Sequence, residues 1–106
     1  MAHVKDKKVT FLVSTIEQDA ELNPIVVWAA LPGAENIWAY YRQASGTEIF
    51  QAATINTKVE AVFEINWRND INTSMQIQYQ GQDYNITRID DFEGYKEALK
   101  IYAYKI

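Results

Sequence analysis

Polar and apolar side chains alternate along much of the chain, most regularly in residues 59–67. Within that stretch the apolar residues Val59, Ala61, Phe63, Ile65 and Trp67 recur at every second position. An alternation with a period of two places apolar side chains on one face of an extended strand and polar side chains on the other. The pattern therefore predicts a half-buried β-strand over residues 59–67.

Other stretches carry the same kind of signal, with many β-branched and aromatic residues. They predict strands over residues 9–16, 36–43, 74–79, 84–89 and 95–106, with a further short apolar run at 25–30. The segment Gln80-Gly81-Gln82-Asp83 predicts a hairpin turn in which Gly81 adopts a positive φ. Residues 17–24 combine clustered acidic side chains with an Asn-Pro turn signal, so we interpret them as a solvated loop.

One helix is predicted between the two central strands. In Ser45-Gly46-Thr47-Glu48 the serine side chain can accept from the backbone N–H three residues later while the glutamate reaches back, which is a capping box. A helix is therefore expected over about residues 46–57, with Ile49, Phe50, Ala53 and Ile55 as a weak apolar surface.

These elements predict an all-β fold: a small β-barrel or sandwich of about six antiparallel strands with one short helix between central strands. Residues 1–8 carry three lysines against one aspartate and no apolar pattern, so we expect a flexible N-terminal arm. Residues 9–106 are then a single β-barrel domain, in line with a chain of 106 residues.

The amino-acid composition argues against several classes of function. The chain has 14 acidic and 10 basic side chains and a net charge of −4, which argues against a protein that grips nucleic acid through phosphate contacts. It has no cysteine, so disulfides, thiolate metal sites and a cysteine nucleophile are excluded. We find neither a signal peptide nor an apolar stretch long enough to cross a membrane, and expect a soluble protein made in a cytoplasm.

No catalytic, metal or cofactor site is predicted. His3 is the only histidine and is far from any placed Ser and Asp. Glu60 and Glu64 share a strand face but lie about 13 Å apart, which is far for a glycosidase pair. The acidic turn at Asp90, Asp91 and Glu93 is interpreted as a charged hairpin tip. The sequence gives no support for an enzyme.

An ordered series of short matches carries a family resemblance. The series comprises Ile37-Trp38-Ala39, Ser45-Gly46-Thr47-Glu48, Ala52, Phe63-Glu64-Ile65, Met75, Tyr79-Gln80-Gly81 and Tyr84-Asn85-Ile86, with Asp19 and Trp28 upstream. In this order they resemble the tailed-phage head–tail joining family, the neck proteins also called head closure or stopper proteins. The segment Leu31-Pro32-Gly33 is longer than usual in that family, and Tyr102-Ala103-Tyr104 departs from its usual ending.

The resemblance implies a virion structural protein of the phage neck. Its copies would form a ring below the portal and adaptor that closes the DNA-filled head and provides the tail attachment surface. The implied partners are other copies of the chain, the portal and adaptor proteins, the tail-completion protein, and viral double-stranded DNA that passes without sequence-specific binding.

Two sets of candidate residues follow from this expectation. The segment between the two central strands is the candidate channel-facing element, with Ser45, Gly46, Thr47, Glu48, Gln51, Asn56 and Lys58. The candidate subunit interface comprises the aromatic residues Trp38, Tyr40, Tyr41, Tyr102 and Tyr104.

Two alternative functions remain open at this point. One is a tail-completion or tail-terminator subunit, since such subunits are also small and β-rich and also assemble into rings. The other is an OB-like module that binds single-stranded nucleic acid or a peptide, because Trp67-Arg68 and the face with Lys100, Tyr102 and Tyr104 mix basic and aromatic side chains.

Overall fold

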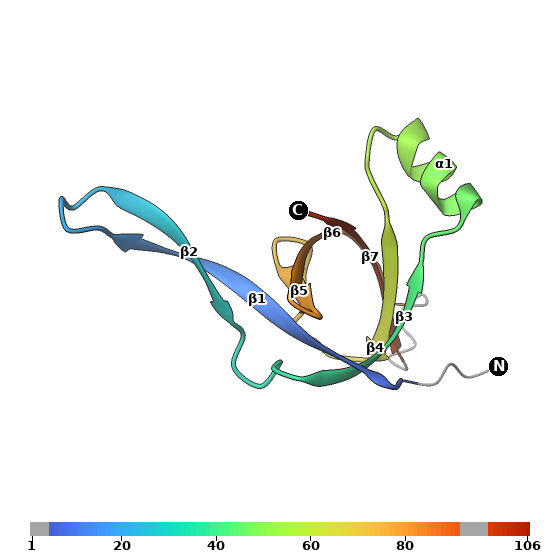
Figure 1. Cartoon of the computed structure of the whole chain (residues 1–106), viewed down its shortest axis with the longest axis horizontal. Coiled ribbons are helices and arrows are strands. Elements are labelled where there is room, and N and C mark those ends of the chain that lie inside the picture. Colours follow the sequence, from blue (N-terminus) through green and yellow to red (C-terminus); the bar gives the residue numbers. More distant parts are fainter. Residues whose placement is uncertain (1–4, 92–97) are drawn as a thin grey trace.

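The computed structural model describes residues 5–91 and 98–106, which form seven strands and one helix (Figure 1). The elements are β1 (Lys7–Gln18), β2 (Pro24–Ala30), β3 (Ile37–Gln43), α1 (Gly46–Thr54), β4 (Ala61–Asn66), β5 (Gln76–Tyr79), β6 (Gln82–Asp90) and β7 (Ala98–Lys105). The predicted all-β fold with one short helix between central strands is confirmed.

Six of the strands close into an antiparallel barrel. The sheet order is β2-β1-β3-β4-β7-β6-β5, and an additional pairing of β1 with β5 joins the two sides. In this closing pair Thr10 lies opposite Gln78 and Leu12 lies opposite Gln76. Closure leaves the six barrel strands without a continuous open edge. The architecture is therefore a barrel and not a sandwich.

The barrel interior is filled by every second residue of its strands. Its largest fully buried side chains are Phe11, Phe63, Ile65, Ile77 and Ile101. Phe63 lies at the centre of an aromatic group, with its ring centroid 5.6 Å from that of Tyr79 and 5.4 Å from that of Tyr84. Edge-to-face rings at such distances contribute beyond their buried area.

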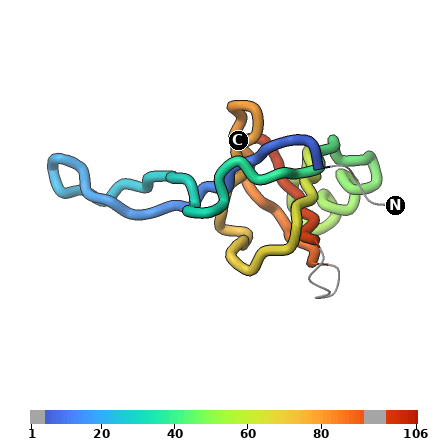
Figure 2. Tube along the Cα trace, turned by 90° about the horizontal axis from the view of Figure 1, so that it is seen from below, coloured from blue at the N-terminus to red at the C-terminus, as the bar shows by residue number. Residues whose placement is uncertain are grey.

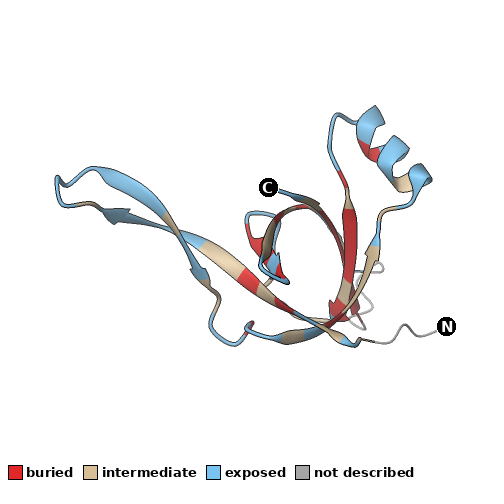
Figure 3. Ribbon diagram, in the orientation of Figure 1, coloured by how far each residue is buried: buried red, intermediate tan, exposed pale blue. Residues whose placement is uncertain are grey.

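A second, smaller cluster lies on the outside of the barrel. It comprises Ala52, Val59, Val62 and Tyr102, and it packs α1 against the outer face of β4 and β7 (Figure 3). Val59 was expected on the interior face with Ala61, and this expectation is wrong. Val59 precedes the first residue of β4, where the chain returns from α1, so the strand alternation does not yet apply to it.

The helix buries a different face from the one predicted. Ala52 is the buried residue of α1, whereas the side chain of Phe50 is 69% exposed and that of Ile49 is 49% exposed. The barrel surface beneath α1 already carries the bulky Val62 and Tyr102, and a small side chain lets the helix approach them. The expected apolar surface of the helix therefore faces solvent.

β1 and β2 form a long hairpin that projects from the barrel (Figure 2). They pair from Leu12 opposite Ala30 to Gln18 opposite Pro24. The interpretation of residues 17–24 as a loop is therefore partly wrong, since the strands continue to the turn. The projection gives the molecule an elongated shape of 53 × 32 × 27 Å.

Asp19 shapes the turn of this hairpin. Its carboxylate Oδ1 accepts hydrogen bonds from the backbone N–H groups of Glu21 and Asn23, both at 2.9 Å. Leu22 has a φ of 64°, in the left-handed region. An aspartate that satisfies nearby backbone donors is a common way to stabilise a tight turn.

The boundaries of the barrel strands differ little from those predicted. β1 begins at Lys7, so Lys7 and Lys8 belong to the sheet and lie opposite Ala39 and Trp38. The β5–β6 turn has a φ of 77° at Gly81, as predicted. Residues 1–4 of the expected arm and residues 95–97 of the expected last strand lie outside the described residues.

Two phenylalanine substitutions test this division between interior and surface. Phe63→Ala should lower the free energy of unfolding by about 3–5 kcal/mol, because it leaves a cavity among aromatic rings. Phe50→Ala should change it by no more than about 0.5 kcal/mol, because that ring is largely exposed. Urea unfolding followed by tryptophan fluorescence measures both, and equal losses would contradict the assignment.

Candidate functional site

α1 begins at the capping box that the sequence predicts. The Oγ of Ser45 accepts from the backbone N–H of Glu48 at 3.2 Å, and the carboxylate of Glu48 accepts from the backbone N–H of Ser45 at 2.9 Å. These bonds satisfy two donors that a helix start would otherwise leave without partners. The start of α1 is thus determined locally.

A bidentate ion pair then fixes the helix to β3. The Arg42 guanidinium donates to the two carboxylate oxygens of Glu48 at 2.6 and 2.8 Å. This hydrogen-bonded pairing, supported by the donors of Ser45, lowers the pKa of Glu48 from 4.5 to about 2. The same pairing raises the pKa of Arg42. Parallel donors of this kind combine geometric specificity with charge attraction.

The end of the helix is turned back toward the barrel. The backbone N–H and the hydroxyl of Thr57 both donate to the carbonyl of Ala52, at 2.9 and 3.1 Å. Asn56, which directly precedes Thr57, has a φ of 61°, in the left-handed region. The chain can therefore leave α1 and enter β4 within a few residues.

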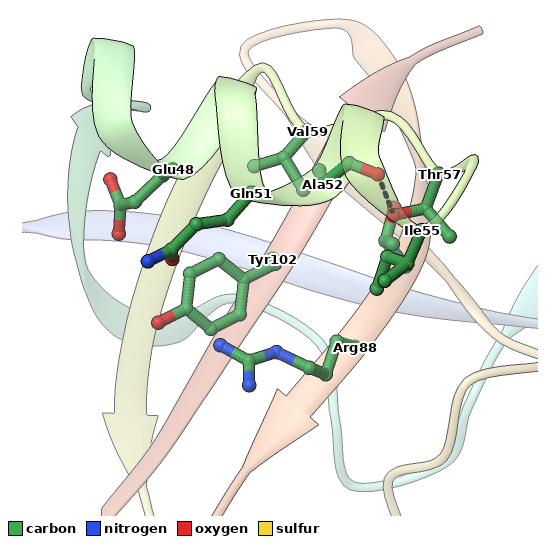
Figure 4. A pocket seen from close by; sticks show the side chains of 9 residues that line it. Glu48, Gln51, Ala52, Ile55, Thr57, Val59, Arg88 and Tyr102 are labelled. Atoms are coloured by element: carbon green, nitrogen blue, oxygen red, sulfur yellow. Dashed lines mark hydrogen bonds between the residues drawn. The ribbon is translucent and has the colours of Figure 1, made fainter.

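A pocket of about 230 Å³ lies between α1 and the strands β6 and β7 (Figure 4). Its lining includes Gln51 and Ile55 of the helix, together with Tyr102 and Arg88 of the sheet. The Arg88 guanidinium carbon stands 4.3 Å from the centre of the Tyr102 ring, a cation–π contact. The pocket thus offers apolar walls and one cationic side chain.

The candidate channel-facing residues all belong to α1 or to its flanking segments. Ser45 and Glu48 take part in the cap, and Gln51 lines the pocket. The Lys58 ammonium lies 3.4 Å from the Glu60 carboxylate and 5.7 Å from the centre of the Tyr104 ring. The structure therefore gathers these residues in one projecting element.

The candidate interface residues are divided between two faces. Tyr41 points into the barrel, with its ring centroid 4.7 Å from that of Tyr79. Tyr102 is buried beneath α1. Trp38 is 53% exposed, and the Lys8 ammonium stands 4.6 Å from the centre of its ring. Trp38, Tyr40 and Tyr104 are the members of this set that keep an accessible outer surface.

Sequence reasoning missed the exposed apolar residues of the β1–β2 hairpin. Ile16, Leu22 and Val26 are 76%, 71% and 64% exposed. The only signal was the β-branched composition of both segments, which looks the same in a buried strand. Their exposure results from the length of the hairpin beyond the barrel.

The described residues contain no metal-binding cluster and no membrane-spanning helix. Within residues 5–91 and 98–106, no group of three or more His, Cys, Asp or Glu side chains is arranged to hold a metal ion. In the same ranges no helix is long and apolar enough to cross a bilayer. Glu93 of the predicted acidic turn lies outside the described residues.

A model of the phage head completion proteins matches residues 5–105 of the sequence. The chain belongs to the phage head completion protein family. It is accordingly a phage protein with a structural role in the virion, at the head–tail connector. The resemblance stated from the ordered sequence matches is confirmed.

Two solved structures share the fold of this head completion protein. The solution structure of a protein from Shigella flexneri 2a is 18% identical, with a TM-score of 0.73 over 93% of this chain and 90% of that one. A chain in the virion of a native gene transfer agent particle is 8% identical, with a TM-score of 0.59 over 99% and 98%. A comparison with curated proteins finds no significant match.

The ion pair at α1 predicts a pH-dependent contribution to stability. Because the pKa of Glu48 falls from 4.5 to about 2 on folding, its contribution is complete above about pH 5 and is lost as the pH falls toward 2. Glu48→Gln should lower the free energy of unfolding at pH 7 by on the order of 2 kcal/mol.

Urea unfolding of both proteins between pH 7 and pH 2 measures this effect. The difference between wild type and Glu48→Gln should shrink as the pH falls through this window. Glu35→Gln, at an exposed carboxylate, serves as the control and should stay within about 0.5 kcal/mol at all pH values. A Glu48→Gln loss that does not vary with pH would rule out the ion pair as its cause.

Proposed function

We propose that this head completion protein forms a homo-oligomeric ring in the neck, below the portal and adaptor. The ring closes the DNA-filled head and presents the surface to which the tail-completion protein attaches. The observation that carries this proposal is the family match over residues 5–105, which includes the whole barrel, the hairpin and α1. The protein acts through assembly and not through catalysis.

The charge of the chain supports passage of DNA through such a ring. Each lysine or arginine that neutralises a phosphate adds affinity by releasing counterions, and many such contacts would retard a moving duplex. A subunit with a net charge of −4 avoids this effect. The protein is made in the cytoplasm of the bacterial host and is then incorporated into the virion.

The position of α1 supports its role as the channel-facing element. The helix lies outside the barrel and is held by the Arg42–Glu48 pair and by the small apolar cluster around Ala52. These contacts hold the helix on the outer face of the barrel and leave its start exposed. We assign Ser45, Gly46 and Thr47, at its exposed start, to the channel lining.

Removal of the gene tests the proposed neck position. In a lysate of the encoding phage that lacks this protein, electron microscopy should show intact separate tails beside tailless heads that have lost their DNA. Complementation with the wild-type gene should restore joined particles. Ordinary tailed virions in the absence of the protein would contradict a role in head completion.

A photo-cross-link tests the channel assignment. The chain contains no cysteine, so Thr47→Cys carries a thiol-linked photoactivatable label at a single position. In filled heads this label should attach to the packaged DNA. Asn69→Cys is the control, because Asn69 follows the end of β4 while α1 precedes its start.

The two positions therefore lie at opposite ends of β4. Labelling of DNA from both positions, or from Asn69→Cys alone, would contradict the assignment of α1 to the channel. So would the absence of DNA labelling from Thr47→Cys in heads that contain the protein.

A further inference from the structure

The projecting part of the β1–β2 hairpin, residues 14–28, lacks the packing that usually stabilises strands. We call this part the ribbon. Of the described elements, β2 lies against β1 alone. Ile16 lies opposite Val26, and Ser14 lies opposite Trp28, so these side chains share one face of the ribbon. An isolated two-stranded ribbon is marginally stable in water, and an exposed apolar patch marks an interaction site.

The ribbon is also the acidic part of the chain. Residues 9–41 contain Glu17, Asp19, Glu21 and Glu35, and they contain no lysine or arginine. This stretch therefore contributes −4, which equals the net charge of the whole chain, while the remaining residues balance at zero. A surface that receives the ribbon should be apolar and should carry cationic side chains.

Such a surface lies beside α1. The pocket there has Ile55, Val59 and Tyr102 in its walls and Arg88 at its side (Figure 4). A second hollow is lined by Lys58, Ile86 and Tyr104, and it shares Thr57 and Thr87 with the pocket. We call these two adjoining hollows the groove. The carboxylate of Glu48 at its edge is bound by Arg42, and Lys58 is paired with Glu60 at 3.4 Å, so Arg88 supplies the positive charge.

The ribbon and the groove lie toward opposite ends of the molecule. Figures 1 and 2 both show the hairpin at one end of the longest axis and α1 toward the other. A single subunit therefore cannot bring its own ribbon to its own groove. Two different surfaces on opposite sides of one chain suit a head-to-tail contact between copies. Such a contact gives a closed ring when the rotation from each copy to the next divides a full turn evenly.

We propose that the ribbon of each subunit docks in the groove of the next copy of the chain. The apolar face with Ile16 and Val26 covers the apolar walls of the groove, and the carboxylate of Glu21, at the tip of the ribbon, approaches Arg88. This inference rests on the proposed ring and identifies its subunit contact.

Charge favours the groove of a second copy over other binding partners of the ribbon. DNA phosphates are repelled by Glu17, Asp19 and Glu21, and the described residues of the ribbon offer no basic side chain in return. A symmetric ribbon-to-ribbon contact would bring the carboxylates of two copies together, and like charges at an interface oppose association. The groove of another copy supplies the opposite charge.

Cross-linking in assembled particles tests the contact. In the double variant Glu21→Cys/Gln51→Cys, one cysteine lies at the tip of the ribbon and the other lines the pocket. A bifunctional maleimide added to purified particles should join successive copies into a ladder that ends at the full ring. Each single-cysteine variant should give no product above a dimer.

Charge exchange gives an independent readout. Glu21→Lys should lower the amount of protein in purified particles by roughly tenfold, because like charges then face each other across the contact. Arg88→Glu should have a similar effect, and the two substitutions combined should restore most of the incorporation. Glu35→Lys, an exposed carboxylate outside the ribbon, and Ile106→Ser, an exposed apolar residue outside both surfaces, are the controls.

The outcomes separate this inference from the proposed function. Particles that contain the double-cysteine variant, retain DNA and give no ladder would overturn the ribbon contact while the neck position stands. The same holds if Glu21→Lys and Arg88→Glu fail to compensate each other. Absence of the wild-type protein from purified particles would overturn both proposals.

Discussion

The pairing of β1 with β5 is the constraint on which the rest of the structure depends. It joins residues 10–12 to residues 76–78, far apart in the sequence, and turns an open sheet into a barrel. Only after closure do Phe11 and Ile77 share an interior with Phe63 and Ile101. The closure also leaves the second half of β1 outside the barrel, where β2 is its one neighbouring element among those described.

Closure explains why the molecule has two projecting parts of different character. The ribbon continues the edge of the barrel and gains no packing from it, so its apolar side chains stay exposed. α1 lies on the outer face, where the small side chain of Ala52 contacts Val62 and Tyr102. The barrel is thus a rigid base from which both parts reach outward, as a component that joins other components requires.

The electrostatic arrangement follows the same division. The Arg42–Glu48 pair is partly buried and shared between β3 and α1, so it fixes the helix position and perturbs the pKa values of both partners. The carboxylates of the ribbon lie at the surface, where solvent and salt screen them. In the ring that we propose, they serve recognition and repulsion of DNA, and they contribute less to the stability of the subunit.

Local chemistry in the sequence determined several features of this protein by itself. The alternation in β4, the capping box at Ser45 and the turn at Gly81 involve residues close together in the chain, and the structure shows each of them as predicted. The family resemblance, carried by short matches along the chain, was also recoverable. In these cases the interacting groups are neighbours in sequence.

The tertiary structure alone decided which surfaces are covered. Periodicity states that Ile49 and Phe50 share part of a helix surface, but Val62 and Tyr102 beneath α1 decided that Ala52 would be buried instead. Periodicity placed Tyr41 opposite Tyr40, yet closure of the barrel decided that Tyr41 faces the interior. The exposure of the ribbon could not be predicted from the sequence for the same reason. Its strands have ordinary β composition, and their exposure depends on where the distant β5 begins, at Gln76 opposite Leu12.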